Sequence, residues 1–334
     1  MKKKLLLTGG AGFIGANFVK TMSLQEDVRA EYDFVILDAL TYAGNYQTIE
    51  QDIKENDHLS FVNIDIRDHD SIDRLFAQEK FAGVLHFAAE SHVDNSISNP
   101  NIFVETNVIG TLNLLNAANK YASQGSGVRF LSVSTDEVYG QLKESEPAFT
   151  ENHPLRPNSP YSASKASADL LALSYFETYN LNVVITRCSN NYGPYQYPEK
   201  LIPLMVNNAI REIPLPVYGD GKNIRDWIYV DDHNRGIWTA FQKGRAGECY
   251  NFGGNSEKRN LDVVKAILKG VARPESLISF VTDRKGHDWR YAIDYTKANK
   301  ELGWEPSVQF EEGISRTINW YLENIKWCDM VGGD

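Results

Sequence analysis

The stretch that decides the fold is TGGAGFIG, Thr8–Gly15. It follows the apolar run Leu5–Leu7 and precedes a segment whose apolar residues recur at helical spacing. The glycines at positions 9, 12 and 15 permit a tight turn, close approach of a pyrophosphate to the backbone, and close packing of a helix on a strand. Free N–H groups at the start of such a helix face the anion. We therefore expect Gly9, Gly12 and Gly15 to hold a dinucleotide, the alternative being a glycine-rich turn without a ligand.

The next apolar run, residues 33–38, ends in Asp38. A carboxylate at this position accepts hydrogen bonds from the ribose hydroxyls of adenosine and repels a 2′-phosphate, which favours NAD over NADP. The alternative is an aspartate that caps the following element. Asp65 and Ile66, at the end of the third run (59–65), are candidates to flank the adenine, or else they form a surface turn.

Strand and helix patterns alternate through the first half of the chain. Continuous apolar strands are typical of a parallel sheet covered by helices on both faces. We therefore predict an α/β fold, a Rossmann-type doubly wound parallel sheet with a smaller mixed α/β substrate-binding lobe. Residues 1–190 are the expected NAD-binding domain and 191–334 mainly the second lobe, with segments around 226–252 interleaving back into the first. The expected strands are 4–9, 33–38, 59–65, 83–89, 128–134, 182–187 and 248–254, and the expected helices include 13–24, 71–78, 105–122, 160–179, 260–271 and 310–325.

The composition excludes several classes of protein. A chain of 334 residues with 42% hydrophobic content can bury a large core. Its formal net charge of -10 gives a nucleic-acid partner no electrostatic support. The three cysteines show neither a pairing pattern nor a metal-ligand spacing, so we expect a reducing compartment and no metal. Because no stretch approaches the roughly 20 apolar residues of a membrane span, and the first apolar run is too short for a signal peptide, we expect a cytoplasmic protein without a membrane partner.

A second motif, PYSASKAS, places Tyr161 and Lys165 four residues apart and so on one face of the expected helix. A lysine ammonium near the phenol, together with an oxidised nicotinamide, would lower the pKa of the tyrosine. The tyrosinate then takes a hydroxyl proton as hydride leaves the same carbon. With Thr135 at the end of the preceding strand, the set suffices for an alcohol oxidation. The alternative is a solvent-facing pair.

Asp136 and Glu137 directly follow Thr135, and a simple alcohol oxidation needs neither of them. A reaction that needs both is oxidation followed by elimination, because oxidation of C4 of a hexose makes the C5 proton acidic. A base removes that proton, an acid protonates the C6 hydroxyl so that it leaves as water, and the stored hydride returns to C6. Each proton transfer by a placed group is worth about 10²–10⁴ in rate. The alternative is a strand-end turn with solvated acids.

A series of longer motifs resembles the extended short-chain dehydrogenase/reductase family and, within its NAD-dependent sugar epimerase/dehydratase group, the dTDP-glucose 4,6-dehydratases. The motifs cover essentially the whole chain and are GGAGFIG, HFAAESHVDNSI, STDEVYG, SPYSASKASAD, CSNNYGPYQYPEKLIPL, PVYGDGKNIRDWIYVDDH and DRKGHDWRYAID. The acidic pair is informative, because UDP-galactose epimerases lack it and GDP-mannose dehydratases typically carry a Ser/Thr-Glu variant. The resemblance implies a homodimeric hydro-lyase that uses NAD to convert dTDP-glucose into dTDP-4-keto-6-deoxy-glucose, in deoxysugar biosynthesis such as that of dTDP-rhamnose.

The resemblance also implies a role for each matching position. Tyr161 is the base for the C4 hydroxyl, supported by Lys165, while Thr135 bonds the C4 oxygen, Asp136 is the acid for the C6 hydroxyl and Glu137 the base at C5. Cofactor-facing positions are Gly9, Gly12, Phe13, Ile14, Gly15, Asp38, Asp65, Ile66, Ala88, Ala89, Ser91, Thr106, Tyr161, Lys165 and Asn190. Substrate positions are Ser91, Thr135, Asn190, Glu199, Lys200, Leu201, Pro216, Tyr218, Arg225, Asn260, Arg284 and His287.

Several alternatives stay open. Arg225 and Arg284 can instead form surface ion pairs with neighbouring aspartates, and His287 can be a packed or solvated residue. Many family members carry Pro at the position of Lys285 and Arg at that of Trp289, which bears on the nucleotide preference. A UDP-glucose 4,6-dehydratase is an alternative, because thymine and uracil differ by one methyl group, worth about 1–3 kcal/mol in a pocket. The acidic pair opposes a UDP-sugar 4-epimerase, and the Tyr-Lys pair opposes a non-enzymatic dinucleotide sensor.

Overall fold

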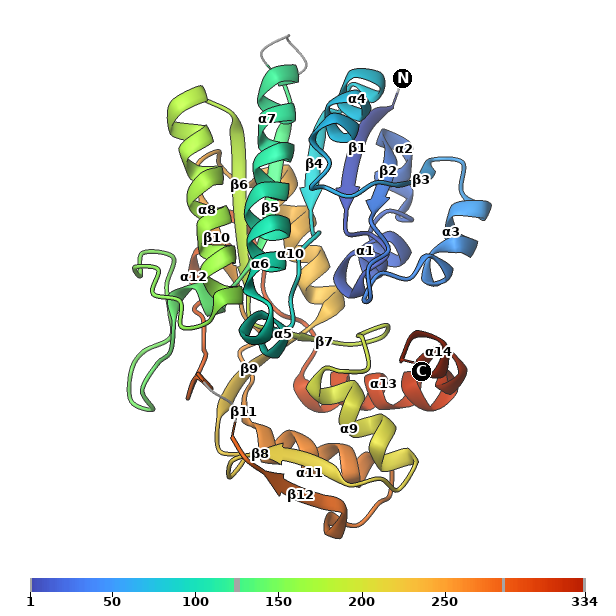
Figure 1. Ribbon diagram of the computed structural model, residues 1–334, viewed down its shortest axis with the longest axis vertical. Coiled ribbons are helices and arrows are strands. Elements are labelled where there is room, and N and C mark those ends of the chain that lie inside the picture. The colour runs from blue at the N-terminus through green and yellow to red at the C-terminus, as the bar shows by residue number, and fades with distance from the viewer. Residues whose placement is uncertain (1, 123–126, 284–285, 333–334) are drawn as a thin grey trace.

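The computed structural model of the chain describes residues 2–122, 127–283 and 286–332 (Figure 1). Within these residues the largest sheet has seven strands in the order β10-β6-β5-β4-β1-β2-β3, and all neighbours run parallel. The predicted doubly wound parallel sheet is therefore confirmed. Its strands are β1 (Lys3–Thr8), β2 (Tyr32–Asp38), β3 (Leu59–Asn63), β4 (Gly83–His86), β5 (Arg129–Thr135), β6 (Asn182–Cys188) and β10 (Cys249–Phe252).

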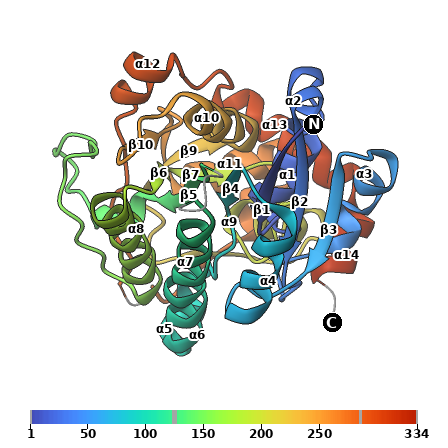
Figure 2. The same cartoon turned by 90° about the horizontal axis from the view of Figure 1, so that it is seen from above.

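Helices cover both faces of this sheet because successive strand residues point to opposite sides. In β1, Leu5 and Leu7 pack into the core on one face and Leu6 into the core on the other. Figure 2 shows α4, α7 and α8 on one side of the strands and α10 and α12 on the other. The helices of the first lobe are α1 (Phe13–Thr21), α2 (Glu26–Glu31), α3 (Glu50–Glu55), α4 (His69–Glu79), α5 (Val93–Ser98), α6 (Pro100–Phe103), α7 (Thr111–Tyr121), α8 (Pro160–Tyr179), α10 (Val230–Lys243) and α12 (Thr296–Leu302).

The second lobe lies below the large sheet in Figure 1 and has a core of its own. The chain returns from it to the large sheet at α10 and β10, which fall within the range 226–252 that we predicted to interleave. The division of the chain at residue 190 stays a prediction. The elements of this lobe are β7 (Asn190–Tyr192), α9 (Leu201–Ile210), β8 (Leu215–Tyr218), β9 (Ile224–Tyr229), β11 (Glu257–Arg259), α11 (Asn260–Gly270), β12 (Ile278–Val281), α13 (Phe310–Glu323) and α14 (Ile325–Gly332).

Several predicted elements differ from the structure in their bounds; for example, the expected strand 83–89 ends at His86 and the expected helix 13–24 at Thr21. Two further differences have a clear physical reason. The third strand ends at Asn63 rather than at Asp65, because the Asp65 carboxylate accepts the backbone N–H of Arg67 at 2.8 Å and turns the chain. The expected helix 105–122 begins as a π-helical turn, η2 (Val104–Gly110), before α7. In that turn the buried Asn107 bonds the backbone N–H and C=O of Glu90, at 2.8 and 3.0 Å. Such bulges often occur at functional sites, and this one holds the segment that follows β4.

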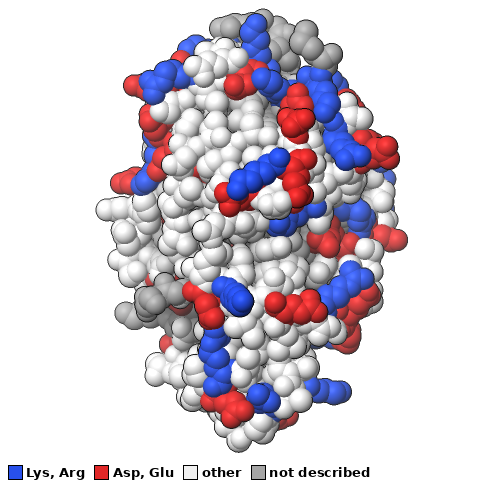
Figure 3. All heavy atoms as spheres, turned by 90° about the vertical axis from the view of Figure 1, so that its right-hand side faces the viewer, with Lys and Arg blue, Asp and Glu red and all other residues white. Residues whose placement is uncertain are grey.

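The surface mixes charges of both signs. On the face that carries α3, Figure 3 shows basic and acidic side chains interspersed. Lys20 pairs with Asp52 at 2.6 Å and Lys54 with Glu50 at 2.9 Å. In the described part of the chain, no helix combines the length and the apolar character that crossing a membrane requires.

Candidate active site

A cavity of about 310 Å³ opens at the carboxyl ends of the central strands. The strand order reverses between β1 and β4, and ligands of open α/β sheets bind outside the carboxyl ends at such a reversal. Predicted residues from loops far apart in the sequence meet here. They are Gly9, Gly12, Phe13, Ile14, Gly15, Asp38, Asp65, Ile66, Ala88, Ala89, Ser91, Thr106, Thr135, Asp136, Glu137, Tyr161, Lys165, Asn190, Glu199 and Lys200.

The glycine loop brings three backbone segments into contact. Gly9 has a φ of +72°, and a Cβ on it would lie 2.6 Å from the backbone nitrogen of Ala88. A Cβ on Gly15 would lie 2.2 Å from the carbonyl oxygen of Gly9, which fixes the start of α1 against the end of β1. Gly12 precedes α1 and supplies no capping side chain. The first N–H groups of α1 are therefore left to a ligand in the cavity.

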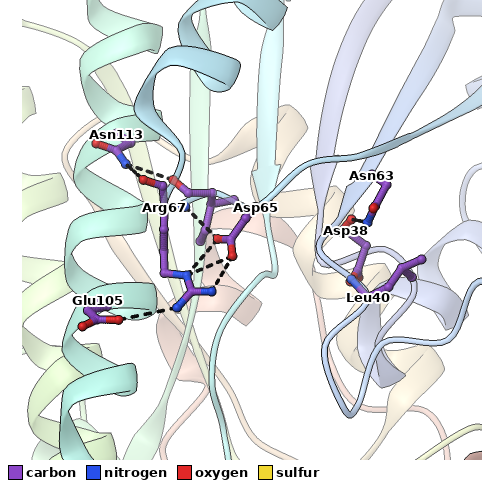
Figure 4. Close-up of polar contacts among 8 residues, drawn as sticks. Asp38, Leu40, Asn63, Asp65, Arg67, Glu105 and Asn113 are labelled. Atoms are coloured by element: carbon purple, nitrogen blue, oxygen red, sulfur yellow. Dashed lines mark hydrogen bonds and ion pairs between the residues drawn. The ribbon is translucent and has the colours of Figure 1, made fainter.

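Asp38 holds the loops around it and also lines the cavity. Its Oδ2 accepts the backbone N–H of Ala11 at 2.9 Å, and its Oδ1 accepts that of Leu40 at 2.8 Å, while Asn63 donates to its carbonyl oxygen (Figure 4). Burial raises the pKa of this carboxyl. Each carboxylate oxygen retains a second lone pair, so Asp38 can tie the glycine loop to β2 and still accept a ribose hydroxyl.

Asp65 is held by a guanidinium at the rim of the cavity. Arg67 donates to it through Nε at 2.9 Å and through a terminal nitrogen at 2.6 Å, and its other terminal nitrogen lies 3.5 Å from Glu105 (Figure 4). Asn113 donates to the carbonyl oxygen of Ile66 at 3.0 Å. Arg67 also lines the cavity, and sequence reasoning missed it because its position depends on these contacts.

The acidic pair sits in two environments. Thr135 ends β5 and caps the turn η4 (Asp136–Tyr139), because its hydroxyl accepts the backbone N–H of Glu137 at 3.3 Å. Asp136 is only 2% exposed, and within the described residues its Oδ2 has no hydrogen-bond partner. Burial raises the pKa of Asp136 well above its ordinary value, and the charge of Glu137 adds to the shift. The raised pKa favours the protonated form of Asp136, while its half-buried neighbour Glu137 lines the same cavity.

Tyr161 and Lys165 lie one turn apart in α8, which begins with a capping box between Ser159 and Ser162. Our prediction of a lowered Tyr161 pKa includes an oxidised nicotinamide beside the phenol, and it stays a prediction. Burial raises the pKa of the phenol well above its usual value, and the charge of Glu137 raises it further. The hydrogen bond that the Lys165 ammonium makes is to the carbonyl oxygen of Val133, at 2.8 Å.

Among the described residues, the remaining substrate positions lie in the second lobe and do not line the cavity. Arg225 is buried, donates to the carbonyl oxygen of Asp288 at 3.0 Å and stands over the ring of Tyr291, so the alternative of a surface ion pair is wrong. The His287 ring pairs with Asp283 at 2.6 Å and packs edge-on to Tyr218. Leu201 begins α9, Pro216 and Tyr218 lie in β8, and Asn260 begins α11. Arg284 lies outside the described residues, as does Lys285.

The residues of the cavity fit NAD. The glycine cradle has no room for side chains at Gly9 and Gly15, and the start of α1 offers uncapped N–H groups to a pyrophosphate. Asp38 offers a carboxylate to a ribose. The same cavity runs from these groups to Tyr161 and Glu137, so a dinucleotide and the acidic pair share one enclosure.

Comparison with known proteins points to one family. The family model described as GDP-mannose 4,6 dehydratase matches residues 6–317. The dTDP-glucose 4,6-dehydratase of Xanthomonas campestris pv. campestris (strain B100) is 53% identical over 98% of this chain and 95% of its own. That of Neisseria meningitidis serogroup B is 48% identical over 98% of this chain and 96% of its own.

Solved structures agree with these sequence matches. The dTDP-glucose 4,6-dehydratase of Streptomyces venezuelae, solved with NAD bound, superposes with a TM-score of 0.92 at 47% identity, over 98% of this chain and 99% of its own. The UDP-glucose 4-epimerase of Thermotoga maritima shares the fold with a TM-score of 0.87 but is only 29% identical, over 96% of this chain and 99% of its own. The chain therefore belongs to the dTDP-glucose 4,6-dehydratase family of extended short-chain dehydrogenase/reductases.

Proposed function

We propose that this chain dehydrates dTDP-glucose to dTDP-4-keto-6-deoxy-glucose with NAD as a resident cofactor, a step of deoxysugar biosynthesis. The family membership supports the activity, and the relatives named above carry that substrate in their names. The observation that carries the mechanism is the difference between two adjacent acids. Burial raises the pKa of Asp136 and so favours its protonated form, whereas Glu137 is half-buried beside it. Two carboxyl groups with separated environments are what an acid and a base require.

The first step removes the C4 hydroxyl proton and the C4 hydride. NAD, when bound, takes up this hydride and later returns it, and its oxidised ring adds the positive charge that lowers the pKa of the Tyr161 phenol. We assign Tyr161 as the base for the hydroxyl proton and Thr135, which lines the cavity beside it, as the donor to the C4 oxygen. We assign Lys165, whose side-chain nitrogen donates to the carbonyl oxygen of Val133, as the residue that supports Tyr161.

The second step removes water across C5 and C6. We assign Glu137 as the base that takes the C5 proton, made acidic by the C4 ketone. Asp136 gives its proton to the C6 oxygen as the C6–O bond breaks, so one water leaves and the electron pair from C5 forms the double bond. The returning hydride adds to C6 and a proton adds to C5. This series of steps leaves the oxidation state of the cofactor unchanged.

We further place the reaction in the cytoplasm. All three cysteines, Cys188, Cys249 and Cys328, are free thiols, which supports a reducing compartment. The expected partner molecule is a nucleotide sugar. The charges on the face in Figure 3 alternate in sign and do not form the basic stripe that would suit a nucleic acid.

We expect the purified protein, incubated with dTDP-glucose and no added reductant, to remove one water from the sugar without net formation of NADH. Mass spectrometry of the nucleotide sugar measures this directly. UDP-glucose, tested in parallel, reports the base preference through the ratio of initial rates. An epimerised sugar of unchanged mass would instead assign the 4-epimerase reaction, and two unchanged sugars with NAD bound would leave a dinucleotide sensor.

The two acids are expected to fail differently when each is neutralised. Asp136→Asn should slow dehydration by about 10²–10⁴ yet still exchange the C5 proton, because Glu137 remains. Glu137→Gln should lose both dehydration and C5 exchange. Incubation in D₂O followed by mass spectrometry of the recovered dTDP-glucose separates the two results.

The pH profile provides an independent readout of the same pair. Asp136 acts in its protonated form, so the wild-type rate is present below the raised pKa of Asp136 and falls as the pH rises through it. The matched control is Glu144→Gln, which removes an exposed carboxylate outside the cavity. In the exchange experiment described above, a loss of C5 exchange that is as complete in Asp136→Asn as in Glu137→Gln would contradict the assignment of the two acids.

We also propose a homodimer that forms through the helices α5 to α8. Apolar side chains that would otherwise face water gather there, namely Ile97, Val104, Ile109, Leu170 and Tyr179. Leu170, in the middle of α8, is 58% exposed. Large exposed apolar groups on neighbouring helices are typical of a helix-to-helix interface.

Leu170→Arg should convert the dimer to a monomer, because a charge at the centre of an apolar interface loses its hydration. Light scattering after gel filtration measures the mass before and after the change. Phe280→Arg is the matched control, since Phe280 is also 58% exposed but lies in β12 of the second lobe. A monomeric wild type, or a dimer that survives Leu170→Arg, would contradict the proposed interface.

A further inference from the structure

The segment Gly193–Lys200, here called the strap, joins β7 to α9 and forms one wall of the cavity. Gln196, Tyr197, Glu199 and Lys200 of the strap line the cavity, opposite residues of the glycine loop and of the loop after β2. None of the expected cofactor positions lies in the strap. Its position nevertheless determines whether the cavity is enclosed on this side.

Several polar contacts join the strap to the first lobe. The Asn17 side chain in α1 donates to the carbonyl oxygen of Pro194 at 2.8 Å. The Tyr42 hydroxyl, in the loop after β2, donates to Glu199 at 3.0 Å. The Lys200 ammonium donates at 2.9 Å to the carbonyl oxygen of Ser91, after β4. These partners belong to the same three segments that carry the glycine cradle, Asp38 and the residues after β4.

The strap is anchored at Tyr195, whose backbone is in an unfavourable conformation. Its φ of +63° lies in the left-handed region, which costs free energy for any residue with a Cβ. The ring packs against Trp320 and Trp327, with centroids 4.5 and 5.5 Å away, and the Lys20 ammonium stands 5.1 Å from its centre. We call Tyr195, Trp320 and Trp327 the aromatic cluster.

The aromatic cluster connects the strap to the end of the chain. Trp320 lies in α13 and Trp327 in α14, and their rings are 5.2 Å apart. The indole N–H of Trp327 donates to the Thr48 hydroxyl of the first lobe at 3.1 Å. Next to Trp320, the Tyr321 hydroxyl donates to the carbonyl oxygen of Gln196 at 2.6 Å. Two helices that do not line the cavity, α13 and α14, thus fix the position of the strap against the first lobe.

The buried side chain of Gln196 indicates that the strap faces a ligand. Its side chain is 8% exposed and lines the cavity, and its Nε2 donates to the carbonyl oxygen of Asn191 at 2.9 Å. In the described part of the chain, its Oε1 is buried without a hydrogen-bond partner. A buried acceptor left unpaired is costly, and a donor on a molecule in the cavity would satisfy it.

We propose that the aromatic cluster consists of positioning residues that keep the strap closed over the dinucleotide. The proposal rests on the proposed function, because a hydride that returns to the same substrate requires a cofactor that stays bound between the two transfers. None of these three residues lines the cavity. Their effect is expected on cofactor release rather than on the chemical steps.

The test measures how fast the NAD-loaded protein loses its cofactor. Tyr195→Gly removes the phenol ring and also the backbone strain at this position. Trp327→Ala removes the indole ring of Trp327. In both variants we expect NAD to dissociate about tenfold faster, since each loses at least one packed aromatic pair. The readout is the NAD content after rapid desalting, followed over time by chromatography. Tyr195→Phe keeps the ring and should retain NAD like the wild type.

A matched pair of tryptophan changes separates this effect from general loosening of the fold. Trp327→Phe loses the bond to Thr48, and Trp304→Phe loses a comparable indole bond, 3.0 Å long, to the carbonyl oxygen of Asp232 outside the aromatic cluster. We expect faster NAD release only for the change at 327, and an unchanged kcat at saturating NAD with a raised KM for NAD.

Wild-type rates of NAD release in folded Tyr195→Gly and Trp327→Ala would overturn the proposal, as would equal acceleration by Trp304→Phe and Trp327→Phe. These outcomes are distinct from failure of the proposed function. A wild type that retains NAD but leaves dTDP-glucose unchanged would remove the dehydratase assignment. A wild type that dehydrates the sugar while all variants retain NAD would remove the strap proposal alone.

Discussion

The close approach of the backbone at Gly9 to the backbone at Ala88 is the constraint on which the site depends. A single added carbon at Gly9 would lie 2.6 Å from the nitrogen of Ala88. This contact sits where the strand order reverses, and it brings the loop after β1 against the segment after β4. The start of α1, the Asp38 bond to Ala11, and the cavity wall after β4 are all placed by it. Close backbone packing therefore shapes this end of the cavity, and side chains such as Asp38 add to it.

A second constraint sets the chemistry, and it operates within one short turn. Thr135 caps η4, so the chain turns immediately after β5 and directs two consecutive carboxyl groups into different surroundings. Burial raises the pKa of Asp136 and so favours its protonated form, while Glu137 stays half-buried at the cavity. The same burial raises the pKa of Tyr161, so the phenol is a poor base until a positive charge is bound nearby. In our account this arrangement restricts the first proton transfer to the state with the cofactor in place.

The parts of the fold that follow from local patterns could be predicted from the sequence. The central strands are continuous apolar runs, and the glycine loop has a strand before it and a helix after it, so the sheet and the cavity-lining residues followed. Other features depend on contacts between distant residues and were missed. The burial of Arg225 depends on Asp288 and Tyr291. The left-handed Tyr195 depends on tryptophans more than a hundred positions away. The π-helical turn at Asn107 depends on its bonds to Glu90.

The central claim is that one hydride leaves C4 and returns to C6 of the same molecule. The most direct measurement follows the label of dTDP-glucose carrying deuterium at C4 through a single turnover in the presence of excess unlabelled NADH. We expect the deuterium at C6 of the 4-keto-6-deoxy product, with none in the free nicotinamide pool. Deuterium that appears in free NADH, or that is retained at C4 of a sugar of unchanged mass, would contradict the account.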